Sequence, residues 1–174
     1  MTRAWIIRRA APWRVDPVDL ASAEPGPGQV LIEVEACAIG PVDLEIAIER
    51  GDEDLEPIPG HAAVGRVAAG AEHLIGRRVL VGPHLPCGEC DVCRRGGAVV
   101  CPAGLELGVT ARGTLAETLI ASARWALPLD GKLAIDGGAA ALLGSDAALA
   151  YALYARASLG PGDPTVVLGD GAVA

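Results

Sequence analysis

The stretch Cys87-Gly-Glu-Cys-Asp-Val-Cys-Arg-Arg-Gly-Gly-Ala-Val-Val-Cys101 holds four of the five cysteines of this chain within 15 residues. Two, two and seven residues separate successive cysteines. A Cys-x-x-Cys turn brings two sulfurs to one ion, and four thiolates complete the tetrahedral shell of a structural zinc site. The sequence therefore predicts a lobe over residues 85–103 that binds one structural zinc ion per chain. Its ligands are Cys87, Cys90, Cys93 and Cys101.

Sulfur at every position leaves such an ion no open site for water or substrate, so the metal would stabilise the lobe without taking part in chemistry. Arg94 and Arg95 follow the third cysteine and are placed to offset the surplus negative charge of four thiolates. Two disulfides or buried free thiols are the alternatives. Residues 1–13 carry three arginines around a short apolar stretch and lack the apolar core of a secretory signal. This favours metal over disulfides and predicts a cytoplasmic protein.

The composition excludes several classes of protein. The 174 residues correspond to one domain and part of a second, since domains average roughly 150 residues. With 51% hydrophobic residues, the chain has the composition of a globular protein and not of a disordered one. Its net charge of −8 argues against nucleic acid and anionic lipid as partners. Polar residues interrupt the most apolar region, 139–159, so we expect no membrane span.

The first two-thirds of the chain has the pattern of short strands and turns. Residues 29–37 alternate between apolar and polar side chains, which is typical of a half-buried strand. Further β-like runs occupy 63–68, 78–81 and 115–121, separated by Gly, Pro and Asp. These runs predict a small, irregular β-barrel and not repeating βαβ units.

The pattern then changes to that of a helix. Residues 139–157 contain no proline and are rich in Ala and Leu at helical spacing, which predicts one core-facing helix of about five turns. Gly160-Pro-Gly-Asp163 ends this helix. We expect residues 165–168 to form a buried strand that leads into a glycine-containing loop.

The order of these features resembles the zinc-type medium-chain alcohol dehydrogenases, and five further segments share the resemblance: Pro25-Gly-Pro-Gly-Gln-Val30, Pro59-Gly-His61, Gly76-Arg-Arg-Val-Leu-Val81, Gly113-Thr-Leu-Ala-Glu117 and Pro161-Gly-Asp163. The resemblance implies a mainly β fold, with a partly open GroES-like barrel and its zinc lobe in residues 1–137. A connecting helix over 138–160 and the first strand of a truncated Rossmann domain over 164–174 would follow. It also implies a homo-oligomer that acts on a small-molecule substrate.

The resemblance further implies a second, catalytic zinc ion, but this chain departs from the ligand pattern. The family's ligands are a Cys, a His followed by Glu, and a Cys, Asp or Glu at the start of the connecting helix. These positions fall on Gly40, on His61 followed by Ala62, and on Ser145. Glycine has no donor atom, and a neutral serine hydroxyl is a poor zinc ligand.

We therefore expect the catalytic zinc to be lost, with His61, Asp43 and Asp146 as the remaining candidate catalytic residues. The family's proton-relay hydroxyl falls on Val42, which cannot carry a proton. A shifted zinc site of Cys37, His61 and Asp146 is an alternative.

The loop Gly169-Asp-Gly-Ala-Val-Ala174 fits the start of a dinucleotide-binding fingerprint. Its candidate cofactor-binding residues are Gly169, Gly171 and Ala174. The helix N-terminus and acidic residue that complete such a site are expected further along a longer chain. NAD(P) binding is therefore expected only together with a C-terminal domain.

Three functional hypotheses follow from the sequence. The first is the catalytic-domain portion of an NAD(P)-dependent dehydrogenase or reductase that keeps the structural zinc and lacks the catalytic one. The second is a non-catalytic, zinc-stabilised pseudoenzyme or interaction module. The third is an alcohol dehydrogenase that uses the shifted ligands.

Overall fold

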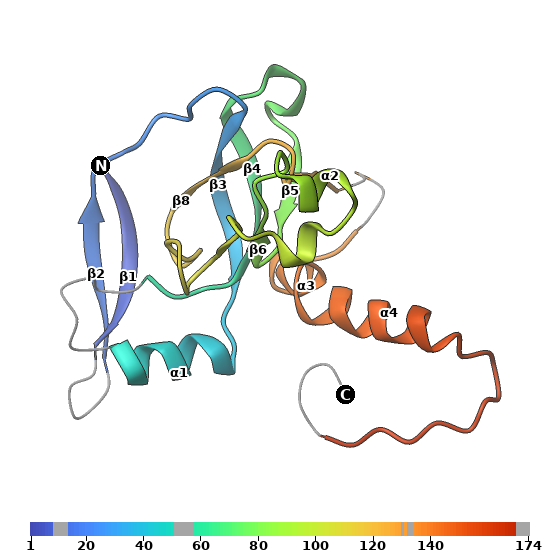
Figure 1. The fold of residues 1–174 in the computed structure, drawn as a ribbon. Helices are drawn as coiled ribbons and strands as arrows, with labels where there is room; N and C mark the ends of the chain where they lie inside the picture. The colour runs from blue at the N-terminus through green and yellow to red at the C-terminus, as the bar shows by residue number, and fades with distance from the viewer. Residues whose placement is uncertain (9–13, 51–57, 130, 132–133, 170–174) are drawn as a thin grey trace.

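The computed structural model describes residues 1–8, 14–50, 58–129, 131 and 134–169. Its centre is a five-stranded antiparallel sheet in the order β8-β3-β4-β5-β9 (Figure 1). These strands are β3 (Gln29–Ala38), β4 (Ala62–Gly70), β5 (Arg78–Val81), β8 (Thr118–Ser122) and β9 (Leu127–Pro128). Two smaller antiparallel pairs are β1 (Thr2–Arg8) with β2 (Arg14–Leu20), and β6 (His84–Leu85) with β7 (Leu105–Glu106).

The helices lie outside this sheet. They are α1 (Pro41–Arg50), α2 (Asp91–Arg94), α3 (Gly137–Leu143) and α4 (Asp146–Ala157), with short 3-10 turns η1 (Glu72–Leu74) and η2 (Ala98–Val100). The main core packs apolar side chains of β3, β4, β5 and β8 around Val30, Ile32, Val67 and Val79, all at most 2% exposed. The predicted mainly β fold is confirmed.

The strand predictions are confirmed with shifts at their ends. Residues 29–37, 63–68 and 78–81 lie in β3, β4 and β5. The run predicted over 115–121 begins as a strand only at Thr118, because residues 115–117 cross over to β1. There Trp5 N donates to Leu115 O and Glu117 N donates to Arg3 O. This crossing joins β1 to the main sheet and closes part of the barrel.

Two elements were missed in the sequence. The pair β1–β2 buries Ala4 and Ile6, which pack with Ile58 and Ala116 in a second apolar cluster. The helix α1 occupies a segment that was predicted to hold only strands and turns. Pro41 occupies the first position of α1, where its missing amide hydrogen costs nothing and its fixed φ suits a helix.

The single helix predicted over 139–157 is wrong, because the structure has α3 and α4 with a bend of 43° between them. The backbone leaves the helical conformation at Ser145, which has φ of −127° and ψ of −94°. Gly144 just before it packs closely on β5, since an added Cβ would lie 3.0 Å from Leu80 Cδ1. Helix α3 buries Ala140 and Ala141 against small side chains of β3 and β4. No single helix among the described residues has the length and apolar composition needed to cross a bilayer; α3 and α4 reach it only as a bent pair.

The expectation that this helical region faces the core holds for α3 and is wrong for α4. No residue of α4 is buried, and Leu149, Tyr151, Leu153 and Tyr154 are each more than half exposed. The buried strand expected over 165–168 is also not formed: these residues are exposed and pair with no strand among the described residues. The chain after α4 runs away from the sheet in Figure 1. A strand requires a neighbour for its backbone hydrogen bonds, and none lies beside it.

A glycine in β4 sets how closely β3 and β4 approach. Gly65 pairs with Val34 next to a register shift in β3. A Cβ at Gly65 would lie 2.2 Å from Glu33 O and 2.7 Å from Ile32 Cγ2. Only a residue without a side chain fits between these atoms.

Replacing Gly65 by alanine is therefore expected to lower the free energy of unfolding by about 2 kcal/mol or more, because the two strands must separate. Urea unfolding monitored by circular dichroism measures this change. Gly160→Ala is the control, since an added methyl there meets Asp163 only at an ordinary contact distance of 3.4 Å. Equal stabilities of the two variants would contradict the close-approach argument.

Candidate metal centre and candidate catalytic pair

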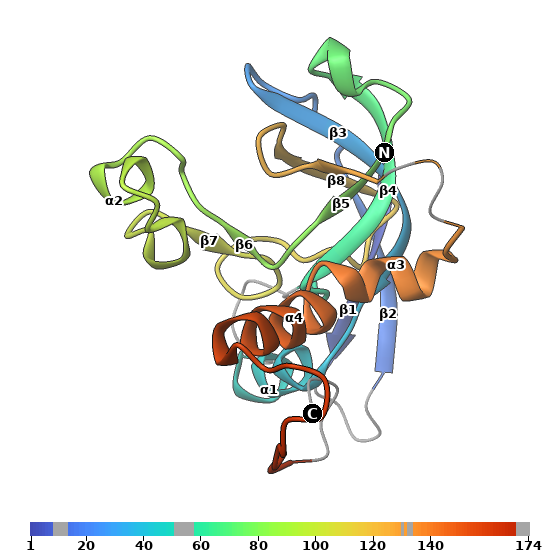
Figure 2. The ribbon, with the colours of Figure 1, turned by 90° about the vertical axis from the view of Figure 1, so that its right-hand side faces the viewer.

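The four clustered cysteines lie in a lobe that projects from the sheet and contains β6, α2, η2 and β7 (Figure 2). Their sulfur atoms lie within 4.8 Å of one another. Among the described residues, they form the one group of three or more His, Cys, Asp or Glu side chains with this geometry. The fold thus brings together all four ligands that the sequence predicted.

The sulfur positions fit a tetrahedral zinc ion. The distances are 4.0 Å from Cys87 to Cys93, 3.9 Å from Cys90 to Cys101 and 3.5 Å from Cys87 to Cys101. Sulfurs at the vertices of a tetrahedron with Zn–S bonds of about 2.3 Å are roughly 3.8 Å apart. A disulfide requires about 2.05 Å, so the cysteines are not paired with one another.

Backbone amides surround the sulfurs and favour their negative charge. Cys90 N donates to Cys87 Sγ, Cys93 N to Cys90 Sγ and Cys87 N to Cys101 Sγ, each at 3.4 Å. The amides of Glu89 and Cys90 lower the pKa of Cys87 to about 6. Burial raises the pKa of Cys93 to about 12, so a metal that binds there displaces its proton. These contacts form because the turn at Cys90 also begins α2.

Arg94 and Arg95 were expected to offset the charge of the thiolates, but their hydrogen bonds go to other groups. The Arg94 guanidinium pairs with Asp91 Oδ1 and donates to Glu89 O. Arg95 Nε donates to Asp91 O at 3.1 Å. Both side chains are exposed and serve the surface of α2, because a helical turn directs them away from the sulfurs.

Two side chains after β8 hold the first turn of the lobe in place. Trp125 Nε1 donates to Pro86 O at 2.7 Å, and Arg124 Nη1 donates to Gly88 O at 2.9 Å. The Arg124 guanidinium also stacks over the Trp125 ring at 5.2 Å from its centroid. These contacts link the lobe to the sheet, and local sequence patterns contain no signal for them.

The candidate catalytic residues His61 and Asp43 form a buried pair. His61 Nδ1 lies 2.8 Å from Asp43 Oδ2, and Asp43 also accepts hydrogen bonds from Gly40 N at 2.8 Å and from Gly60 N at 2.6 Å. A carboxylate only accepts, so Nδ1 carries a hydrogen and Nε2 is the ring nitrogen that Asp43 leaves free. Among the described residues no hydrogen bond to Nε2 is found, and the His61 side chain is 11% exposed.

Gly40 lies directly beside the His61 ring. A Cβ added to Gly40 would lie 3.2 Å from His61 Cε1, so a side chain at this position would meet the imidazole. Ser145 precedes α4, and its Oγ is buried without a hydrogen-bond partner in the described chain. Gly40 thus lies beside the imidazole without a donor atom, and Ser145 offers one neutral oxygen.

The shifted zinc site is not formed. Cys37, His61 and Asp146 do not come together as a metal-binding group in the described part of the chain. Burial raises the pKa of the Cys37 thiol, the charge of Asp43 raises it further, and a hydrogen bond with Thr114 opposes both. Cys37 packs against the main core because its position in β3 turns the side chain inward.

The cofactor-loop prediction is only partly within the described residues. Gly169 has φ of +133°, a conformation that favours glycine. Gly171 and Ala174 lie outside the described residues. The loop therefore contributes no observed site in this structure.

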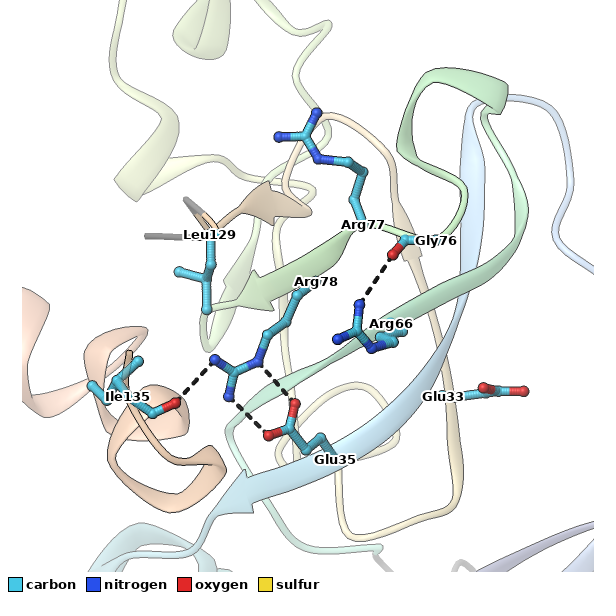
Figure 3. Close-up of a pocket in the computed structure, with 9 residues that line it drawn as sticks. Glu33, Glu35, Arg66, Gly76, Arg77, Arg78, Leu129 and Ile135 are labelled. Atoms are coloured by element: carbon cyan, nitrogen blue, oxygen red, sulfur yellow. Dashed lines mark hydrogen bonds and ion pairs between the residues drawn. The ribbon is translucent and has the colours of Figure 1, made fainter. Parts of the chain in front are cut away.

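A hollow of about 750 Å³ lies on the outer face of the sheet and contains none of the predicted site residues (Figure 3). Arg78 binds Glu35 through two hydrogen bonds of 2.8 Å and donates to Ile135 O at 3.1 Å. Arg66 donates to Gly76 O at 3.2 Å. Arg78 thus joins β3 and β5 to the chain before α3.

Comparison with known proteins agrees with this arrangement. Residues 26–131 match the alcohol dehydrogenase GroES-like domain. The chain belongs to this family. Over 114 residues it is 40% identical to an L-threonine 3-dehydrogenase of Xanthomonas axonopodis pv. citri and 39% identical to one of Stenotrophomonas maltophilia. Each alignment covers 60% of this chain and 34% of the relative, so the aligned part is about a third of each curated relative.

Solved structures of the family share the fold. A cinnamyl alcohol dehydrogenase of Sorghum bicolor superposes with a TM-score of 0.75 at 26% identity, over 90% of this chain and 48% of that one. A cobalt- and zinc-bound thermostable alcohol dehydrogenase of Pyrobaculum aerophilum gives a TM-score of 0.73 at 26% identity, over 92% and 50%. This GroES-like domain therefore has the architecture of the catalytic-domain portion of zinc-binding medium-chain dehydrogenases.

Replacing Cys93 by serine is expected to abolish firm zinc binding, because the tetrahedral shell loses a thiolate. The zinc content measured after gel filtration should fall from one ion per chain to well below one. Cys37→Ser is the matched control and should keep one ion, since Cys37 lies outside the cluster. Loss of zinc in both variants would contradict the assigned ligands.

Replacing Asp43 by asparagine is expected to lower the free energy of unfolding by about 1–3 kcal/mol, because the new amide group faces donors and leaves buried amides unpaired. Chemical denaturation of the zinc-loaded chain measures the change. Asp19→Asn, at a carboxylate that is 60% exposed, should change the stability by about 0.5 kcal/mol or less. If Asp43→Asn lowers the free energy of unfolding no more than Asp19→Asn does, the hydrogen bonds of Asp43 are dispensable for stability.

Proposed function

We propose that this chain is the catalytic-domain portion of an NAD(P)-dependent medium-chain dehydrogenase or reductase that binds one structural zinc ion and has lost the catalytic one. Support for the class comes from the family match and from the L-threonine 3-dehydrogenases that it resembles. Support for a single zinc comes from the four-cysteine lobe, which is complete.

The main support for the loss of the catalytic zinc is the lack of good metal ligands at two positions, one beside His61 and one just before α4. Gly40 offers no donor atom and lies next to the imidazole, and Ser145 offers only a neutral hydroxyl. One imidazole does not hold a zinc ion with useful affinity. The residues present therefore do not fit a catalytic zinc, and no step of the proposed chemistry passes through one.

Without this ion, His61 is the group best placed to move a proton. Its Nε2 makes no hydrogen bond among the described residues, while Asp43 accepts from Nδ1–H and orients the ring. A bound nicotinamide supplies or accepts the hydride, and the residues 169–174 would contribute to its site in a longer chain. In reduction, His61 Nε2–H gives a proton to the substrate atom that becomes negative; in oxidation, Nε2 accepts it.

The substrate class follows from the missing Lewis acid. An unactivated alcohol is a poor hydride donor unless its oxygen is deprotonated, and a zinc ion would normally assist this step. A carbonyl or double bond already activated by its own substituents needs less assistance. We therefore propose reduction of activated carbonyl or enone compounds as the favoured reaction. Asp146, at the start of α4, is a weaker candidate catalytic residue than His61.

A non-catalytic, zinc-stabilised module is the second candidate function. The lack of a metal ligand at Gly40 and of a carboxylate at Ala62 favours this candidate, because both side chains would be needed for zinc-dependent catalysis. The buried hydrogen bonds of Asp43 still stabilise the fold. The two candidates differ in whether His61 moves a proton during turnover.

The metal content of the chain tests the loss of the catalytic zinc. Native protein and the His61→Gln variant are both expected to bind one zinc ion, measured by inductively coupled plasma mass spectrometry. The Gly40→Cys/Ser145→Cys variant restores two thiolate donors and is expected to bind a second ion. Two ions in the native chain, falling to one in His61→Gln, would overturn the proposal.

Turnover separates the reductase from the non-catalytic module. The complete protein, with its nucleotide-binding domain, is expected to oxidise NADH or NADPH in the presence of an activated carbonyl, and L-threonine with NAD is the first oxidative substrate to test. His61→Gln should lower kcat by about 100-fold, in the range of a lost general acid. Nicotinamide binding without any turnover across such a panel would favour the second candidate.

A further inference from the structure

His84 lies at the base of the zinc lobe and bonds through both ring nitrogens. It is on β6, opposite Glu106 on β7. Its Nδ1 lies 2.5 Å from Glu106 Oε1, and its Nε2 lies 2.9 Å from Ala98 O in η2. The ring therefore connects the two-stranded stem of the lobe to the segment that leads into the fourth zinc ligand.

The chemistry of these partners sets the number of protons. A backbone carbonyl only accepts, so Nε2 must carry a hydrogen. Either Nδ1 donates to the Glu106 carboxylate or a protonated Glu106 donates to Nδ1. Both arrangements contain one proton more than a neutral imidazole beside a carboxylate. Among the described residues, Glu106 is the one charged group in contact with the ring.

Ala98 connects His84 to the segment that holds the fourth cysteine. Its carbonyl oxygen also accepts a hydrogen bond from Cys101 N at 3.1 Å. The same oxygen thus joins His84 to the backbone of a zinc ligand. Breaking the His84 contact would free η2 to move, and with it the position of the Cys101 sulfur.

The surroundings are shaped to hold this ring. A Cβ at Gly104 would lie 2.6 Å from His84 Cε1, so a larger residue would displace the imidazole. Glu106 is fixed in turn by its backbone, since Glu106 N donates to Thr110 Oγ1 and Glu106 O accepts from Thr110 N. These bonds fix the backbone of β7 at the residue that carries the acceptor.

We propose that His84 is a positioning residue that holds the zinc lobe closed through its two ring contacts, with Glu106 and with Ala98 O. Without these contacts the lobe holds Cys101 less firmly and releases zinc faster. The role is independent of the proposed reductase activity, because it concerns only the retention of the structural metal.

The test compares zinc release from the zinc-loaded chain and from His84→Gln at one fixed pH. A chromogenic chelator such as 4-(2-pyridylazo)resorcinol reports the rate. The variant is expected to release zinc about fivefold to tenfold faster, as for the loss of one hydrogen bond. Thiolate protonation affects both proteins alike, so their ratio isolates the His84 contribution.

Two further measurements keep the result interpretable if His84→Gln folds poorly. Glu106→Gln keeps the shape of the acceptor and removes its charge, so it should also release zinc faster than the native chain. His73→Gln, at an exposed histidine on η1, should release zinc at the native rate. Release from His84→Gln and Glu106→Gln at the native rate would overturn the proposal.

Discussion

The carboxylate of Asp43 is the contact on which the arrangement around His61 depends. It is 3% exposed and accepts hydrogen bonds from Gly40 N, Gly60 N and His61 Nδ1. These donors come from the end of β3 and from the chain that leads into β4, so one side chain of α1 joins three segments. A buried charge is stable only when its neighbours satisfy it, and here every one of these contacts is a donor. Such a node preserves the orientation of His61 whatever occupies the position beside it.

The domain therefore contains two sites that differ in how many possible metal ligands they offer. The cysteine lobe has four sulfurs at tetrahedral separations and amides that stabilise thiolates. The pair at His61 keeps its supporting carboxylate and lacks donor atoms at the neighbouring positions. The two sites lie on different elements and share none of the contacts described above. A substitution at one site therefore leaves the described contacts of the other in place.

The lobe is held to the chain after β8 at its first turn and is braced by a contact inside it. Trp125 and Arg124 bind the backbone at Pro86 and Gly88, and within the lobe His84 binds Ala98. All of these contacts end on backbone carbonyls, so they constrain the path of the chain and leave the sulfurs free for metal. A small lobe without a large apolar core depends on such ties and on its ion.

The sequence by itself determined the clustering of the four cysteines and the main strands. Cysteine spacing and two-residue alternation are local signals, and both describe the structure well. The bend at Gly144, the exposed face of α4 and the crossing of residues 115–117 to β1 were decided by tertiary packing. So was the pairing of His61 with Asp43, which lie 18 positions apart. Contacts between distant segments depend on how closely the elements approach in space, and no local pattern of residues encodes that distance.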